Sequence, residues 1–273
     1  MQALGRGAAR LGYVGLAVAS VLTACTAAPG SRPSPPAAQT SPTALTSPAA
    51  RPVDPDPRVG AVYLGDGDLH TCTASVLAPS SANLILTAGH CLARGIEARF
   101  VPGDGDGDGD GVVEAGSWAV DAVYLDPRWV TGTDPAADFA VAHVSRSDGA
   151  GLQSVVGDGL RLATSPRPGA EVTVIGYPAG VGGGPAACRA STAPALRGFP
   201  TLHCAGVVGG FSGAPWITGS SVSGLVGGLD GGGCAEEVSY SPPFDDAVAR
   251  LQARAQAGGP GDDPPPFFDD GCG

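Results

Sequence analysis

Short β-prone runs recur along the chain from about Arg58 onwards, and they set the strongest limit on its fold. Gly, Pro, Asp and Ser residues separate these runs, and almost no stretch shows the spacing of an amphipathic helix. Many short strands with such punctuation are typical of an all-β barrel or sandwich. The expected strands are residues 59–64, 73–77, 84–87, 119–125, 139–144, 171–175, 214–218 and 222–229.

One segment near the C-terminus breaks this pattern. Over residues 245–257, Val248, Leu251 and Ala255 recur at helical spacing behind an acidic first turn. This spacing predicts one short C-terminal α-helix. Residues 258–273 follow it as an acidic, Pro- and Gly-rich tail.

The N-terminus has the features of an export signal over residues 1–25. Arg6 and Arg10 supply positive charge, and residues 11–22 form an apolar run that is too short to span a bilayer. Residues 22–25 read Leu-Thr-Ala-Cys and resemble the bacterial lipobox, in which the cysteine is lipid-modified and becomes the mature N-terminus. The alternative is an ordinary secretory signal that is cut a few residues later. We expect an exported protein that Cys25 anchors by lipid to the outer face of the cell membrane, or a secreted one if Cys25 is not modified.

Residues 26–57 are dominated by Ala, Pro, Ser and Thr. Such a stretch buries too little apolar area to fold, so it predicts a disordered linker that tethers the domain. We therefore expect the folded domain to cover residues 58–257.

The chain has seven cysteines, a formal net charge of −11 and no lysine. The negative charge argues against a nucleic-acid partner, because nothing would attract phosphates. No Cys-x-x-Cys pair or His/Cys cluster has the spacing of a zinc site. With Cys25 set aside, an even number remains for structural disulfides in an oxidising compartment, namely the cysteines at 72, 91, 188, 204, 234 and 272.

Residues 103–111 alternate Gly and Asp. Carboxylates at every second position occur in calcium loops, but the glutamate that closes an EF-hand is replaced here by alanine or serine. An irregular calcium loop through Asp104, Asp106 and Asp108 is one interpretation. We favour a solvated low-complexity loop, and we expect no metal and no cofactor.

Residues 209–215 read Gly-Gly-Phe-Ser-Gly-Ala-Pro and place Ser212 between glycines. Glycines allow a tight turn in which neighbouring N–H groups point into one small volume. That geometry exposes a nucleophilic hydroxyl beside an oxyanion hole. A Gly-rich surface turn is the alternative, and a base and an acid elsewhere in the chain decide between the two.

All four histidines precede Ser212. This order excludes the α/β-hydrolase type, which needs the serine first, and the lack of lysine excludes Ser/Lys mechanisms. His90 follows the buried-type strand 84–87 after two small residues, and it is the favoured base. Asp138, which opens an apolar strand, is preferred as the acid over Asp134, which a proline follows. The remaining histidines, at 70, 143 and 203, are given no catalytic role.

The order His90, Asp138, Ser212 with these neighbours resembles the chymotrypsin-like (trypsin-like) serine peptidases, in their bacterial secreted or lipoprotein form. Residues 87–91, Thr-Ala-Gly-His-Cys, resemble the family's Thr-Ala-Ala-His-Cys. Asp-Phe-Ala from Asp138 resembles Asp-Ile-Ala, and Gly-Phe-Ser-Gly-Ala-Pro around Ser212 resembles Gly-Asp-Ser-Gly-Gly-Pro. The resemblance implies two packed six-stranded antiparallel β-barrels, over residues 58–150 and 151–257, with a short C-terminal α-helix.

Carried over by position, the resemblance makes Ser212 the nucleophile, His90 the general base and then acid, and Asp138 the residue that orients His90. The backbone N–H groups of Gly210 and Ser212 would form the oxyanion hole. The bridge beside the catalytic histidine would join Cys72 to Cys91. The further pairings are Cys188–Cys204 and, as the remainder, Cys234–Cys272.

Two departures from the family are visible. Phe211 stands where vertebrate enzymes carry an aspartate that receives a freshly cleaved N-terminal ammonium, so that zymogen switch is not expected. Val208 replaces a cysteine before the nucleophile. Gly206 lies near the place of trypsin's pocket aspartate, so trypsin specificity is not supported. Acidic residues at 230, 236 and 237 would favour basic substrates if they lined the cleft, and solvated loop charges are the commoner case.

These observations predict an exported, monomeric serine endopeptidase that acts on protein or peptide substrates through an acyl-enzyme. The alternative is a peptidase-fold binding protein at the cell surface with weak or no catalysis.

Overall fold

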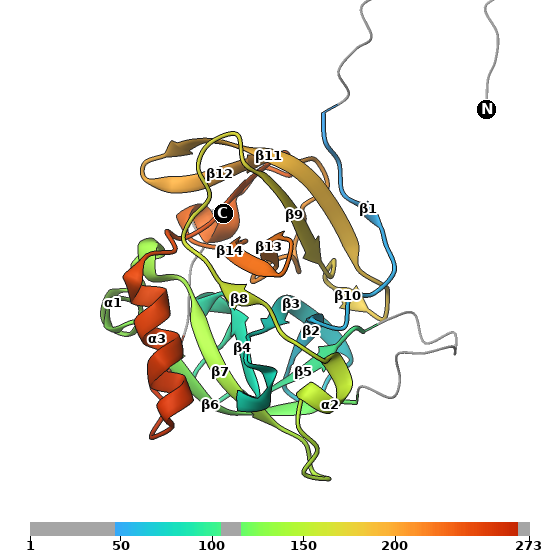
Figure 1. Ribbon diagram of the computed structural model, residues 1–273, viewed down its shortest axis with the longest axis vertical. Coiled ribbons are helices and arrows are strands. Elements are labelled where there is room, and N and C mark those ends of the chain that lie inside the picture. Colours follow the sequence, from blue (N-terminus) through green and yellow to red (C-terminus); the bar gives the residue numbers. More distant parts are fainter. Residues whose placement is uncertain (1–46, 105–115, 267–273) are drawn as a thin grey trace, which may run out of the picture. The chain divides into compact units, whose positions relative to one another are not determined.

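Two β-sheets account for most of the regular structure in residues 47–104 and 116–266, which are the residues that the computed structural model describes (Figure 1). The predicted signal, Cys25, most of the linker, Asp106, Asp108 and Cys272 lie outside these residues.

The first sheet is a closed six-stranded antiparallel barrel. Its strands follow the order β3-β2-β5-β6-β7-β4, and a β3–β4 pairing closes the ring. Apolar side chains fill the interior, where β4 is buried along its whole length and the β6 side chain Trp118 is fully buried. The strands are β2 (Val59–Leu64), β3 (Leu69–Val76), β4 (Leu84–Thr87), β5 (Ala98–Pro102), β6 (Trp118–Leu125) and β7 (Ala140–Ser145).

The second sheet has eight strands where the resemblance implied six. Its order is β15-β12-β11-β9-β13-β14-β8, with β1 attached to β11. Two of its members are only two residues long, and β8 runs parallel to β14. Among the described residues no strand pairing joins the two ends of this sheet, although the Gly227 N–H donates to the Tyr240 carbonyl at 3.1 Å. The strands are β1 (Arg51–Pro52), β8 (Arg161–Leu162), β9 (Glu171–Gly176), β11 (Ala186–Leu196), β12 (Phe199–His203), β13 (Pro215–Thr218), β14 (Ser221–Leu225) and β15 (Val238–Tyr240).

The predicted C-terminal helix is confirmed as α3 (Asp246–Ala257). Asp245 caps it by accepting a hydrogen bond from the Ala247 N–H at 2.7 Å. Its apolar face packs against the core of the first barrel, beside β6 and β7 (Figure 1). Two shorter helices, α1 (Pro127–Gly132) and α2 (Gln153–Val156), were not predicted, because one or two turns are too short to show a helical period. None of the helices in the described part of the chain is long and apolar enough to cross a membrane.

Some residues of the predicted linker pair with the folded domain. The Ala50 N–H donates to the Ala205 carbonyl at 2.8 Å, and β1 pairs with Ala186 and Ala187 of β11. The folded domain therefore includes the last residues before Arg58. Backbone pairing of this kind needs no apolar side chains, so the Ala- and Pro-rich composition gave no signal of it.

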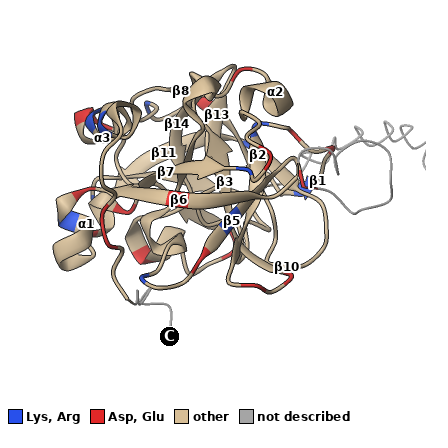
Figure 2. Ribbon diagram, turned by 90° about the horizontal axis from the view of Figure 1, so that it is seen from below, with Lys and Arg blue, Asp and Glu red and all other residues tan. Residues whose placement is uncertain are grey.

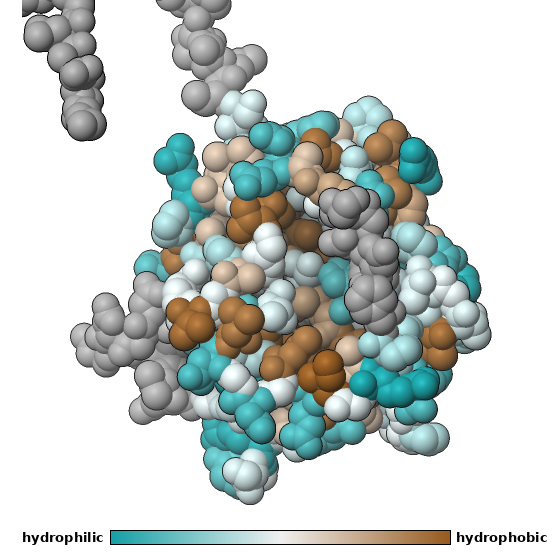
Figure 3. Space-filling model, turned by 180° about the vertical axis from the view of Figure 1, so that it is seen from behind, coloured by the Kyte–Doolittle hydropathy of each residue, from teal (hydrophilic) through white to brown (hydrophobic). Residues whose placement is uncertain are grey.

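Charged and apolar side chains are spread over the surface of the described residues. Charged residues lie mainly in loops and at strand ends (Figure 2). Apolar groups form separate spots among polar ones on the face in Figure 3.

One short strand, β10 (Gly180–Val181), extends the first sheet by pairing with β3, and places the exposed Val181 opposite the exposed Leu69.

Candidate active site

His90 and Asp138 form a hydrogen-bonded pair at the edge of the first barrel. Strand β4 ends at Thr87, and a 3₁₀ turn over Gly89–Cys91 then carries His90. The Asp138 carboxylate accepts from His90 twice: Oδ2 lies 2.8 Å from Nδ1, and Oδ1 lies 2.9 Å from the backbone nitrogen. Asp138 is fully buried, and the His90 side chain is 12% exposed. With Nδ1–H held by the carboxylate, Nε2 is the nitrogen that can accept a proton.

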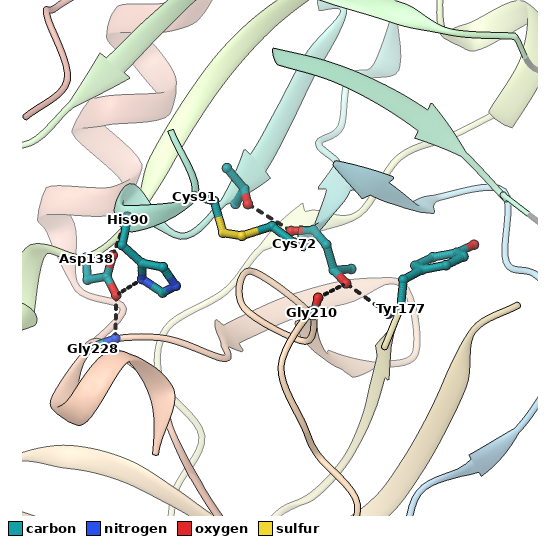
Figure 4. The surroundings of a disulfide bond; sticks show 9 residues. Cys72, His90, Cys91, Asp138, Tyr177, Gly210 and Gly228 are labelled. Atoms are coloured by element: carbon teal, nitrogen blue, oxygen red, sulfur yellow. Dashed lines mark hydrogen bonds and ion pairs between the residues drawn. A yellow bond between two sulfur atoms is a disulfide. The ribbon is translucent and has the colours of Figure 1, made fainter. Parts of the chain in front are cut away.

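A third donor to Asp138 is a backbone N–H group that was not predicted from the sequence. The Gly228 N–H donates to Asp138 Oδ2 at 2.7 Å (Figure 4). A Cβ at Gly227 would lie 3.0 Å from the same oxygen, so the chain passes close to the carboxylate. Three N–H groups thus satisfy a carboxylate that has no access to water. The Gly-Gly pair just after β14 was the available signal, because glycine permits such close approach.

Asp134, the competing acid, has a different partner. Its side chain accepts a hydrogen bond from the Ala136 N–H at 2.9 Å and caps the 3₁₀ turn Pro135–Ala137. This turn leads directly into Asp138. The preference for Asp138 as the partner of His90 agrees with this geometry.

A disulfide joins Cys72 of β3 to Cys91, beside His90 (Figure 4). The two Sγ atoms and a ring nitrogen of His90 lie within 4.8 Å of one another. Because the sulfurs are bonded to each other, they offer no thiolate to a metal. The bridge fixes the His90 turn to the neighbouring strand.

The second implied disulfide, Cys188–Cys204, is also present and joins β11 to the end of β12. Cys234 is disulfide-bonded as well. Its predicted partner, Cys272, lies outside the described residues, so the Cys234–Cys272 pairing stays a prediction.

The loop of Ser212 lies against the segments that hold His90 and Asp138. The Ser212 carbonyl accepts from the Thr73 N–H at 2.8 Å. A Cβ at Gly213 would lie 3.0 Å from the Ala88 nitrogen, two residues before His90. On its other side, the Gly213 N–H donates to the Val226 carbonyl at 2.7 Å, just before the glycines that approach Asp138. Ser212 itself is partly exposed.

The peptide between Gly209 and Gly210 has a fixed orientation. The Ala179 N–H donates to the Gly209 carbonyl at 2.7 Å. Because carbonyl and N–H point in opposite directions in a trans peptide, the Gly210 N–H points away from Ala179. Gly210 has φ +94°, and a Cβ there would lie 2.1 Å from the Ala179 nitrogen, so only glycine fits.

The other histidines lie elsewhere. His70 is buried in β3, and its Nε2 lies 2.7 Å from the Pro178 carbonyl oxygen. His143 lies on the outer face of β7 with Nδ1 3.4 Å from Asp121, and both side chains are well exposed. His203 is exposed on β12. Among the described residues, only His90 is paired with a fully buried carboxylate.

The remaining residues singled out in the sequence have other neighbours or are exposed. Asp104 accepts a hydrogen bond from the Tyr63 hydroxyl, and burial together with that bond raises the pKa of Tyr63. The other two calcium candidates, Asp106 and Asp108, lie outside the described residues. The acidic side chains at 230, 236 and 237 are exposed. Gly206 has φ +78°, and a Cβ there would lie 3.6 Å from that of Ala50.

Comparison with known proteins agrees with this geometry. Residues 72–227 match the trypsin-like peptidase domain. The chain belongs to the trypsin-like peptidase family. No curated protein sequence matches it.

Solved structures of serine proteases share its chymotrypsin-like fold. The crystal structure of the protease Anisep from Arthrobacter nicotinovorans has a TM-score of 0.65 and 22% identity, over 77% of this chain and 100% of that one. The thermostable serine protease AL20 from an extremophilic microorganism has a TM-score of 0.62 and 23% identity, over 75% and 99%. A Glu endopeptidase has a TM-score of 0.59 and 18% identity, over 77% and 97%.

Phe211 gives this trypsin-like peptidase a different anchor for the residue before Ser212. Its ring is fully buried in the apolar core of the second sheet. A Cβ at Gly176 would lie 2.4 Å from that ring, so the β9 glycine makes room for it. An apolar side chain at this position cannot form an ion pair with an N-terminal ammonium group.

Proposed function

We propose that the protein is an exported serine endopeptidase that hydrolyses peptide bonds through Ser212, His90 and Asp138. The observation that carries this proposal is the buried Asp138–His90 pair, in which the carboxylate binds Nδ1 and so makes Nε2 the ring nitrogen that would act as the base. The contacts of the Ser212 loop with Thr73, Ala88 and Val226 support its position beside that pair. Family membership supports a peptide substrate.

In the proposed reaction His90 Nε2 accepts the Ser212 hydroxyl proton while Oγ attacks the peptide carbonyl. The C–N bond of the tetrahedral intermediate breaks, and His90 returns the proton to the departing amine. Water then attacks the acyl-enzyme with His90 again as base, which releases the carboxylic acid and restores Ser212. Asp138 stays ionised and stabilises the imidazolium that forms in each step.

The proposed oxyanion hole consists of the Gly210 and Ser212 N–H groups. The hydrogen bond from Ala179 to the Gly209 carbonyl supports it, because it turns the Gly210 N–H to the opposite side. Each donor aimed at the developing oxyanion is worth about 3 kcal/mol in enzymes of this kind.

The proposed location is outside the cytoplasm, with Cys25 as lipid anchor. Two disulfides in the described residues support an oxidising compartment. Mass spectrometry of the mature N-terminus tests the anchor. A lipid-modified cysteine is expected there, and an unmodified start downstream of Cys25 would leave a secreted enzyme.

Labelling with a fluorophosphonate probe tests the catalytic proposal. We expect native protein to be labelled at Ser212, denatured protein to be unlabelled, and Ser212→Ala to lose labelling with little change in stability. A native protein that stays unlabelled would favour a binding protein on this fold. Cleavage of a peptide library by a protein sample that the probe labels would then define the substrate.

A further inference from the structure

Thr73 makes four hydrogen bonds, two of which reach the proposed catalytic loop. It lies in β3 next to the disulfide-bonded Cys72 and is fully buried. Its hydroxyl donates to the Gly210 carbonyl at 2.8 Å and accepts from the Tyr177 N–H at 2.9 Å (Figure 4). Its own N–H donates to the Ser212 carbonyl at 2.8 Å, and its carbonyl accepts from the Thr87 hydroxyl at 2.8 Å.

The Thr73 hydroxyl both donates and accepts a hydrogen bond. It has one proton, which goes to Gly210, and a lone pair, which receives the Tyr177 N–H. Serine can make the same pair of bonds. Valine has almost the same shape and can make neither, so it would leave a buried carbonyl and a buried N–H without partners.

These bonds act on the backbone at Gly210, where the residue itself does little to limit rotation. Gly210 can rotate easily because it has no Cβ, and a rotation of its peptide planes would turn its N–H away from the substrate. The Gly209 carbonyl is held by Ala179 and the Gly210 carbonyl by Thr73. The planes on both sides of the Gly210 Cα are therefore restrained by partners outside the loop, and within the loop the Phe211 N–H also donates to the Val208 carbonyl at 3.1 Å. With Phe211 buried in the core, no ion pair between an aspartate and a new N-terminus is available for this purpose.

We propose that Thr73 is a positioning residue that holds the oxyanion hole in its formed state through the bond from its hydroxyl to Gly210. This inference rests on the proposed serine peptidase activity. In this inference a side chain of the first barrel restrains the oxyanion hole. In the vertebrate enzymes the ion pair formed after proteolytic activation supplies that restraint.

The test compares Thr73→Val and Thr73→Ser with a matched control. Thr192→Val is that control, because Thr192 is also a buried threonine whose hydroxyl donates to a backbone carbonyl, that of Arg167 at 2.8 Å, far along β11. Thr73→Ala, which leaves room for a water molecule, serves as a second variant if the valine does not fold. The readouts are the rate of fluorophosphonate labelling, the acylation burst with p-nitrophenyl acetate, and thermal unfolding.

We expect Thr73→Val to slow labelling and acylation by about 10- to 100-fold, since misplacing one hole donor has effects of this order. Thr73→Ser should stay within about threefold of the parent chain. Thr192→Val should keep the parent rate even if its unfolding temperature falls as far as that of Thr73→Val.

Equal rates in the parent and a folded Thr73→Val would overturn the inference, and so would rates that follow unfolding temperature alone across all variants. Failure of the parent chain to be labelled would instead refute the proposed activity. The two failures are therefore distinguishable.

Discussion

Replacing Asp138 by asparagine tests the proposed mechanism at its most buried point. The carboxylate receives three N–H donors, from His90 Nδ1 and Gly228 on Oδ2 and from the His90 backbone on Oδ1. Asparagine has one oxygen and one NH₂ group in nearly the same volume. Whichever way the amide is placed, at least one donor then faces another donor.

The two placements have different consequences for His90. With NH₂ in place of Oδ1, the imidazole keeps its Nδ1–H bond, but the backbone N–H of His90 loses its acceptor. With NH₂ in place of Oδ2, Gly228 loses its acceptor and His90 must move its proton to Nε2, where it can no longer act as a base. A buried donor without an acceptor costs about 1–3 kcal/mol, so the variant should lose about that much unfolding free energy. In chymotrypsin-type enzymes the same change lowers kcat about 10⁴-fold, and we expect a comparable loss here.

Two measurements check this prediction: the acylation burst with p-nitrophenyl acetate and urea unfolding of the same samples. A matched control is Asp134→Asn, which changes the neighbouring carboxylate that caps a turn and should leave the rate within a few-fold. A folded Asp138→Asn that acylates within about tenfold of the parent rate would refute the role of Asp138. Equal rate losses in both variants would show that the surrounding turn matters, not the contact with His90.

Three further changes test the surroundings of the site. Gly89→Ala places a methyl group 2.8 Å from the Trp129 indole, so we expect it to cost about 1–3 kcal/mol in unfolding free energy. An unchanged unfolding free energy would show that the Trp129 side chain can move aside without cost. Burial raises the pKa of Asp56, but its hydrogen bonds from Arg58 outweigh this and lower it. The stabilisation is then present above the unfolded pKa and lost as pH falls through the folded one, so Asp56→Asn should cost about 0.5–1 kcal/mol at pH 7 and nothing in strong acid. A chain beginning at Arg58 lacks β1 and should unfold at a lower temperature than one beginning at Ser47; equal temperatures would refute a structural role for β1.

The sequence predicted strands where β-branched and large apolar residues gather. The predicted bounds of β2 and β4 are confirmed, those of β6 and β9 differ by one residue at one end, and those of β7 differ by one residue at both ends. Strand β11 was missed although it is the longest, because it is rich in Ala, Ser and Thr and contains a proline. It is stabilised by pairing with β9 and β12, which a local pattern cannot reveal.

The chemistry of the site was predictable only where a side chain supplies it. His90 and Asp138 were singled out by residue type and neighbours, and the structure brings them together. The Gly228 N–H and the Ala179 N–H were missed, because a backbone donor has no residue type to mark it. Their positions depend on where the chain turns, which sequence patterns of this length do not specify.

Strand β3 connects the two halves of the proposed site through consecutive residues. Cys72 holds the His90 turn through its disulfide, and Thr73 holds the Gly210 and Ser212 carbonyls. The proposed base and the proposed nucleophile are therefore both attached to one strand, although they are more than a hundred residues apart in the chain. Any shift of β3 relative to the second sheet would move these two attachments together, so the distance between base and nucleophile is better protected than the distance of either from the rest of the second sheet. Disorder introduced into β3 should consequently affect catalysis more than the same disorder in an equally buried strand such as β11.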